Sequence, residues 1–178
     1  MLPAPVKLFI GILASDASSF KMAEEKLASI FGAIDLKTNA QGIPFTFTDY
    51  YTKEMGNNVK RFFLSFEKPI KPDDITGIKI KTNNLEEAIA GEASTKASRP
   101  INLDPGYLTP SKIILATTKD YAHRIYLKDG IYAETTLQYR TSKGGFQAMA
   151  WTYPDYCTKE YLDFFNQMRK LYLTQNSQ

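Results

Sequence analysis

The spacing of apolar positions predicts a buried strand and two amphipathic helices. Residues 6–14 form a short, nearly continuous apolar run, which is typical of a buried strand. Apolar residues recur every three or four positions over residues 20–31, and Gly32 supplies the end of that helix. The same spacing over residues 161–171, with Thr158 as N-cap, predicts a second helix that packs on a sheet.

Aromatic and β-branched residues predict further strands in the first half of the chain. Residues 45–51 and 61–67 are rich in such side chains and flank a turn-forming cluster at residues 55–58, so we expect an antiparallel pair. Asn83 as N-cap predicts a short helix over residues 84–90. The order of strand, helix, strand, strand and helix indicates a ferredoxin-like first half.

The second half begins with a predicted turn and strand. Asp104, Pro105 and Gly106 have the chemistry of a turn, since proline restricts φ and glycine accepts positive φ. Residues 113–118 predict a strand.

A hairpin around residues 128–130 has a register that can be argued. A three-residue loop there keeps Ile125 and Leu127 on one apolar face and places Arg124 opposite Glu134 on a polar face. A two-residue loop would move Glu134 onto the apolar face, which burial penalises. The predicted pairs are Leu127 with Ile131, Ile125 with Ala133, His123 with Thr135, Arg124 with Glu134, and Tyr126 with Tyr132.

These elements predict an α+β fold, with an antiparallel or mixed sheet and two main amphipathic helices. The 178 residues are expected to form a single domain, with residues 1–92 and 99–178 as two halves that share one core.

Composition narrows the classes of function. A formal net charge of +3 does not support a nucleic-acid partner, and a single cysteine and a single histidine exclude the usual zinc sites. A metal such as Mg²⁺ on carboxylates stays open, and the cofactor is unknown. The apolar stretch near the N-terminus lacks the features of a signal peptide, and no segment is long enough to span a membrane, so we expect a cytoplasmic protein.

Common catalytic motifs are absent from the sequence. There is no G-x-x-x-x-G-K-[ST] loop, no G-x-G-x-x-G after the first strand and no G-x-S-x-G elbow. A hydrolytic triad would have to use His123.

Polar residues in and beside the predicted strands form a candidate site. If their loops converge, Arg99, Lys119 and Arg124 would bind a phosphate or carboxylate, since arginine offers two parallel donors. The candidate ligand-binding residues are Arg99, Asn102, Lys119, Arg124 and Tyr126, and the candidate catalytic residues are His123, Asp104 and Glu134. The catalytic residues would move protons in phosphoester or phosphoryl chemistry.

Several of these residues also have a purely structural interpretation. Arg124 and Glu134 can form a cross-strand ion pair on a solvated face, and Asp104 can anchor its turn. His123 can be a hydrogen-bonded structural histidine. Tyrosines can also form a platform on which bases stack, but rings that are buried with their hydroxyls in water are the ordinary explanation. These tyrosines are Tyr50, Tyr51, Tyr126, Tyr132, Tyr153 and Tyr156.

An ordered set of motifs along nearly the whole chain resembles a bacterial family catalogued as a domain of unknown function, number 4416. The motifs are Thr48-Asp49-Tyr50-Tyr51 with Glu54-Met55-Gly56, Arg61 with Ser65-Phe66-Glu67, Asn102-Leu103-Asp104-Pro105-Gly106-Tyr107-Leu108, His123-Arg124-Ile125-Tyr126-Leu127, Gly130-Ile131-Tyr132-Ala133-Glu134, and Thr152-Tyr153-Pro154-Asp155-Tyr156. The resemblance implies no activity, cofactor or catalytic residue.

Two classes of function follow from the sequence. The first is binding of a small phosphorylated molecule or nucleotide, with phosphoester chemistry as the reaction class. The second is a noncatalytic module that meets a protein partner through exposed aromatic side chains.

Overall fold

The computed structural model describes residues 3–95 and 97–175. The strands are β1 (Lys7–Ala14), β2 (Ile34–Lys37), β3 (Ile43–Pro44), β4 (Lys60–Phe66), β5 (Ile101–Thr109), β6 (Lys112–Thr117), β7 (Ile125–Lys128), β8 (Ile131–Arg140) and β9 (Gly145–Ala148). The α-helices are α1 (Ala17–Phe31), α2 (Thr52–Met55), α3 (Ile75–Glu92) and α4 (Lys159–Gln175). Short 3-10 turns lie at Pro72–Asp74, Thr141–Lys143 and Pro154–Cys157.

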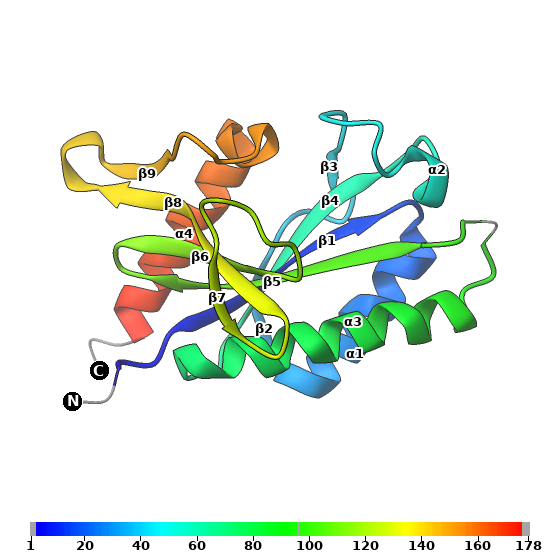
Figure 1. The fold of residues 1–178 in the computed structure, drawn as a ribbon, viewed down its shortest axis with the longest axis horizontal. Coiled ribbons are helices and arrows are strands. Elements are labelled where there is room, and N and C mark those ends of the chain that lie inside the picture. The colour runs from blue at the N-terminus through cyan, green and yellow to red at the C-terminus, as the bar shows by residue number, and fades with distance from the viewer. Residues whose placement is uncertain (1–2, 96, 176–178) are drawn as a thin grey trace.

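The strands join into one antiparallel sheet between two helical layers. Its order is β2-β4-β1-β5-β6-β8-β7, with β3 beside β4 and β9 beside β8. Helices α1 and α3 cover one face, and α4 covers the other (Figure 1). The predicted α+β class with an antiparallel sheet is therefore confirmed.

The first half of the chain has the strand order of a ferredoxin-like unit. β1 pairs antiparallel with both β4 and β5, and β2 pairs antiparallel with β4, which gives the order β2-β4-β1-β5. Helices α1 and α3 connect these strands on one face, as in a split βαβ arrangement. The later strands extend this unit on the free side of β5.

Strand β1 lies at the centre and supplies both cores, since every residue in it is buried. Leu8, Ile10 and Ile12 pack under α1 and α3, whereas Phe9 packs with Phe165 of α4 on the other face. The continuous apolar run is thus explained by burial on both faces.

Both predicted amphipathic helices are present, and a third long helix was missed. Asp16 caps α1 by accepting a hydrogen bond from the backbone N–H of Ser19, and Thr158 directly precedes α4. This third helix, α3, has 18 residues, where the sequence predicted only a short helix over residues 84–90. Asn83 lies inside α3 rather than capping it, since tertiary packing stabilises a helix across a region rich in asparagine and β-branched residues.

Residues 45–51 do not form the predicted strand. Pairing with β4 is confined to Ile43 and Pro44, and after Phe45 the chain turns into the short helix α2. Within the segment, the side chain of Thr48 accepts a hydrogen bond from the backbone N–H of Tyr50, which replaces a ladder contact. The segment therefore forms an aromatic loop beside the sheet.

The predicted turn at residues 104–106 is also wrong, because these residues lie inside β5. Asp104 and Pro105 pair with Gly11 and Ile10 of β1. Pairing of β5 with β6 begins only at Gly106, next to the proline, which has no N–H to donate. Ala116 and Thr117, the last residues of β6, pair with β8 but not with β5. The two strands β5 and β6 therefore separate at this end.

The hairpin of β7 and β8 confirms part of the predicted register. Ile125 pairs with Ala133 and Tyr126 with Tyr132, as expected, but an irregularity at the end of β7 brings Lys128 opposite Ile131. The loop thus has two residues, both with positive φ.

The predicted burial of this hairpin is wrong. Ile125 is 72% exposed, whereas Glu134, on the face expected to be solvated, is 3% exposed. Other segments cover Glu134 and its neighbours, whereas Ile125 is left largely exposed and Leu127 is 39% exposed.

Gly106→Ala is expected to destabilise the fold by about 3 kcal/mol, since overpacking a sheet backbone is costly. A Cβ at this position would lie 2.4 Å from the carbonyl oxygen of Ile114 and 2.6 Å from the ring of Phe9. Chemical denaturation measures the change. The control Gly77→Ala in α3 meets no atom within 4 Å and should stabilise the protein by about 0.5–1 kcal/mol. Equal changes in the free energy of unfolding for the two substitutions would contradict the close packing of Gly106 against Ile114 and Phe9.

Candidate ligand-binding cavity

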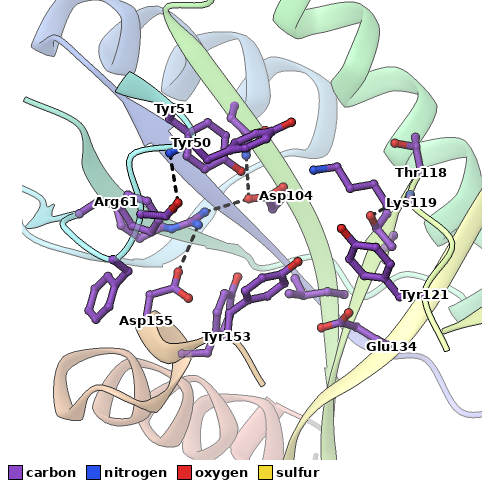
Figure 2. A pocket seen from close by; sticks show the side chains of 18 of the residues that line it. Tyr50, Tyr51, Arg61, Asp104, Thr118, Lys119, Tyr121, Glu134, Tyr153 and Asp155 are labelled. Carbon is purple, nitrogen blue, oxygen red and sulfur yellow. Dashed lines mark hydrogen bonds and ion pairs between the residues drawn. The ribbon is translucent and has the colours of Figure 1, made fainter. Parts of the chain in front are cut away.

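A cavity of about 460 Å³ lies where β5 and β6 separate. Its walls come from the loop at residues 45–51, from β4, β5 and α3, from the loop after β6, and from the segment before α4 (Figure 2). The aromatic lining residues are Phe45, Phe47, Tyr50, Tyr51, Tyr121, Tyr153 and Tyr156, and the charged ones are Arg61, Lys79, Arg99, Lys119, Arg124, Asp104, Glu134 and Asp155.

Arg61 of β4 forms the centre of the cavity floor. Its Nη1 lies 2.9 Å from Asp104 Oδ2 and its Nη2 lies 3.4 Å from Asp155 Oδ2, so two carboxylates share one buried guanidinium. Gly11 of β1 leaves the space for this arrangement, because a Cβ there would lie 3.2 Å from Nη1 of Arg61. The aromatic ring of Phe45 packs against the guanidinium, 5.5 Å from its central carbon to the ring centroid.

A chain of hydrogen bonds extends from Asp104 to α3. Asn102 Nδ2 donates to Asp104 Oδ2 at 2.7 Å, and Asn102 Oδ1 accepts from Arg99. Arg99 in turn donates to Glu86 at 2.9 Å, and Glu86 also accepts the backbone N–H of Leu103. Asn102 and Arg99 thus hold β5 against α3.

The pKa values of the two floor carboxylates are shifted in opposite directions. Burial by itself would raise the pKa of Asp104, but the charges of Arg61 and Lys79 and the hydrogen bond from Asn102 bring it below its usual value. Burial raises the pKa of Asp155, and the charge of Arg61 offsets this only in part. Neighbouring carboxylates whose pKa values move in opposite directions are suited to different tasks.

Glu134 is the centre of a second polar cluster. Its Oε2 accepts from Arg124 Nε at 2.7 Å and lies 3.1 Å from His123 Nε2, and its Oε1 accepts from Thr136 at 3.1 Å. His123 stacks on Trp151 with ring centroids 5.5 Å apart. The cluster joins β7, β8 and the segment before α4, so the predicted contact of Arg124 with Glu134 is confirmed in a buried setting.

Two lysines face the cavity without a carboxylate partner among the described residues. Lys79 donates to the backbone carbonyl of Leu103 at 2.8 Å. Lys119, in the exposed loop after β6, has its Nζ 4.7 Å from the ring centroid of Tyr50. Neither lysine forms an ion pair in this part of the chain, whereas Arg61, Arg99 and Arg124 each do.

The structure brings together six of the eight residues predicted for the site. Those that line the cavity are Arg99, Asn102, Asp104, Lys119, Arg124 and Glu134. His123 does not line it and reaches it only through Glu134. Tyr126 lies outside on β7 and contacts Tyr132.

Sequence analysis named Tyr50, Tyr51, Tyr153 and Tyr156 as candidates for stacking, but did not single out Arg61, Lys79 or the other aromatic lining residues, which are Phe45, Phe47 and Tyr121. Arg61 lies within a predicted strand, where only burial beside two carboxylates sets it apart, and Lys79 lies in the part of α3 that was not predicted. Asp155 follows Pro154 in a segment with turn chemistry, and its contact with Arg61, 94 positions away in sequence, carries no local signal.

In the described part of the chain, no group of three or more histidine, cysteine, aspartate or glutamate side chains is placed to hold a metal ion. The two carboxylates of the cavity floor, Asp104 and Asp155, form ion pairs with the guanidinium of Arg61.

A family model described as Domain of unknown function (DUF4416) matches residues 4–172. The chain belongs to this family. A search of curated proteins and a search of solved structures each found no match. The DUF4416 assignment confirms the resemblance seen in the sequence and adds no activity or ligand to the cavity.

In this DUF4416 chain, none of the helices within the described residues combines the length and the apolar content that crossing a membrane requires.

Asp104→Asn should lower the free energy of unfolding by about 2 kcal/mol at pH 7, the scale of hydrogen bonds to charged groups. Because the pKa of Asp104 is lower in the folded protein, its ionised form stabilises the fold above the unfolded-state pKa. This contribution disappears as the pH falls through the lower folded-state pKa. The difference in free energy of unfolding between wild type and Asp104→Asn should therefore shrink below about pH 4.

Denaturation of both proteins between pH 3 and pH 7 measures this difference. Asp120→Asn, in the exposed loop after β6, serves as the control and should leave stability unchanged throughout. A deficit for Asp104→Asn that does not change with pH would contradict the ionic role of Asp104.

Proposed function

We propose that the cavity binds a small phosphorylated molecule with a planar ring, of which a nucleotide is the best example. The observation that carries this proposal is that Lys79 and Lys119 face an aromatic-lined cavity without a carboxylate partner in the described residues. A phosphate is an anion with several acceptor oxygens, and lysine supplies a mobile positive charge with three donors.

The arginines contribute less to this binding than the sequence suggested. Arg61 is taken up by Asp104 and Asp155, Arg99 by Glu86, and Arg124 by Glu134. A buried arginine that leaves its carboxylate would leave a charge without a partner, which costs several kcal/mol. Lys119 has no such partner in the described residues and lies in an exposed loop, so it is free to turn toward a phosphate.

The tyrosines supply the surface for a ring. Tyr50, Tyr121 and Tyr153 line the cavity and are each between 46% and 60% exposed. Lys119 lies over the ring of Tyr50 and Arg124 over the ring of Tyr121, so a ligand ring would share these rings with a cation or displace it. Stacking of a base on an aromatic side chain contributes about 1–3 kcal/mol and tolerates different bases. The volume of 460 Å³ lies within the usual range for small-molecule sites.

Of the three residues predicted to be catalytic, Asp104 is better placed than Glu134 or His123 to accept a proton from a hydroxyl of the ligand. Glu134 already accepts from Arg124 and Thr136 and contacts His123. Asp104 receives both of its hydrogen bonds on one oxygen and is 29% exposed at its side chain, so its other oxygen is available as a base.

The proposal predicts that nucleotides or sugar phosphates raise the melting temperature of the full chain, since a ligand of the folded state stabilises it. Lys119→Ala should weaken the binding of such a ligand about tenfold, the equivalent of one charge-assisted hydrogen bond. Tyr50→Ala should weaken binding of a base-containing ligand by about tenfold or more through lost stacking. Thermal shift finds the ligand, and isothermal titration measures the change in Kd.

Matched controls lie outside the cavity. Lys112→Ala changes an exposed lysine at the other end of β6, and Tyr126→Ala changes a tyrosine that is 57% exposed, close to the 60% of Tyr50. Both should leave Kd unchanged. If no phosphorylated compound shifts the melting temperature, or if the control substitutions weaken binding as much as the cavity substitutions do, the proposed function is wrong.

A second candidate function is assembly through β7. This strand ends the sheet order, and Ile125, Tyr126 and Leu127 are exposed on it, which is unusual for an edge strand.

If β7 pairs with another copy, the wild-type protein should self-associate in sedimentation velocity at tens of micromolar, and Ile125→Glu should be monomeric. The control Ile30→Glu, on α1 at 46% exposure, should behave as wild type. A wild-type protein that is monomeric at these concentrations excludes this assembly.

A further inference from the structure

Polar atoms without partners gather at the cavity floor around Gly11. Both hydrogen bonds to Asp104 end on Oδ2, so Oδ1 has no partner among the described residues. The hydroxyl of Tyr156 and the Nε of Arg61 are also without a hydrogen-bond partner in the described part of the chain, although both are buried. Such atoms are uncommon in folded proteins, and each calls for a partner that completes it.

These atoms lie close together. Gly11 pairs with Asp104 across the sheet, and a Cβ on Gly11 would lie 3.2 Å from Arg61 Nη1 and 3.4 Å from the Tyr156 hydroxyl. Arg61 Nη1 is itself 2.9 Å from Asp104 Oδ2. Burial raises the pKa of Tyr156, so its hydroxyl keeps its proton and stays a donor. The floor thus places an acceptor of Asp104 and the buried hydroxyl of Tyr156, neither with a partner among the described residues, around the same glycine.

We propose that this floor binds a hydroxyl group of the ligand, and that the ligand is therefore a hydroxylated phosphate ester, a ribonucleotide or a sugar phosphate. A phosphate oxygen only accepts and would be repelled by Asp104 and Asp155, and an ammonium group only donates. A hydroxyl does both, so it can donate to Asp104 and accept from Tyr156. This inference rests on the proposed function and adds the chemistry of the end of the ligand that carries no phosphate.

The arrangement also orients the ligand. Figure 2 shows Asp104 and Asp155 reaching the Arg61 guanidinium from two sides, while Lys119 enters from another wall. The phosphate binds at the Lys119 side and the hydroxyls at the floor, with the ring of a nucleotide against the tyrosines. Lys119 therefore governs affinity for the phosphate, and Asp104 and Tyr156 govern selection for hydroxyls.

The test compares ligands that differ only in hydroxyls, using the full chain. Isothermal titration with a ribonucleoside 5′-monophosphate and its 2′,3′-dideoxy counterpart should show about tenfold tighter binding of the ribonucleotide. Ribose 5-phosphate against 2-deoxyribose 5-phosphate forms a second arm, which shows whether the ligand needs a base. Tyr156→Phe removes one unpartnered hydroxyl without changing the ring packing, and should reduce the ratio of affinities about threefold or more. Asp104→Asn should reduce that ratio similarly at a temperature where circular dichroism shows it folded.

Asp120→Asn is the control, since Asp120 does not line the cavity, and it should keep the wild-type ratio. Equal binding of hydroxylated and deoxygenated ligands by the wild-type protein would overturn this inference and leave the proposed function standing. A ratio that neither Tyr156→Phe nor Asp104→Asn changes would also overturn it. Absence of binding by every phosphorylated ligand would remove the proposed function and this inference with it.

Discussion

The buried charge of Arg61 is the constraint around which this protein is arranged. A guanidinium with almost no exposure is stable only where carboxylates reach it, and here they come from β5 and from the segment before α4. The ion pairs therefore join three parts of the chain that are far apart in sequence. They also lie tightly against Gly11, since a Cβ there would be 3.2 Å from Arg61 Nη1 and 3.2 Å from the ring of Phe63.

A second constraint is the proline in β5. A sheet strand with proline loses a donor, and pairing with β6 ends beside Pro105. The separation of β5 from β6 opens the space that the loops from residues 45–51, the β6–β7 connection and the segment before α4 then surround. The cavity is thus a consequence of a break in the sheet, and its polar lining comes partly from strand residues such as Arg61 and Asp104 and partly from α3 and the surrounding loops.

The polar cluster at Glu134 shows how tertiary packing reverses a local pattern. Alternation in the hairpin correctly predicted that Arg124 and Glu134 share a face, and that Ile125 shares a face with Ala133. Alternation cannot say which face is covered. On the polar face, the carboxylate of Glu134 is satisfied by Arg124, Thr136 and His123, and His123 stacks on Trp151. On the other face, Ile125 of β7 is left exposed.

The sequence by itself determined the elements whose signal is local. Helices α1 and α4 and strand β1 follow from spacing and caps. The ferredoxin-like order was inferred with a strand at residues 45–51 that the structure does not have, whereas β2 and β5, which complete the observed order, were not predicted. Polar residues such as Asn102, Asp104 and Lys119 stand out because they lie within or beside apolar segments. The tertiary structure alone decided that the stretch with turn chemistry at Asp104 is a strand, that α3 is long, and that Arg61 and Asp155 meet. The physical reason is that strand pairing, burial and ion pairs join residues distant in sequence, so their energies leave no trace in any short window of the chain.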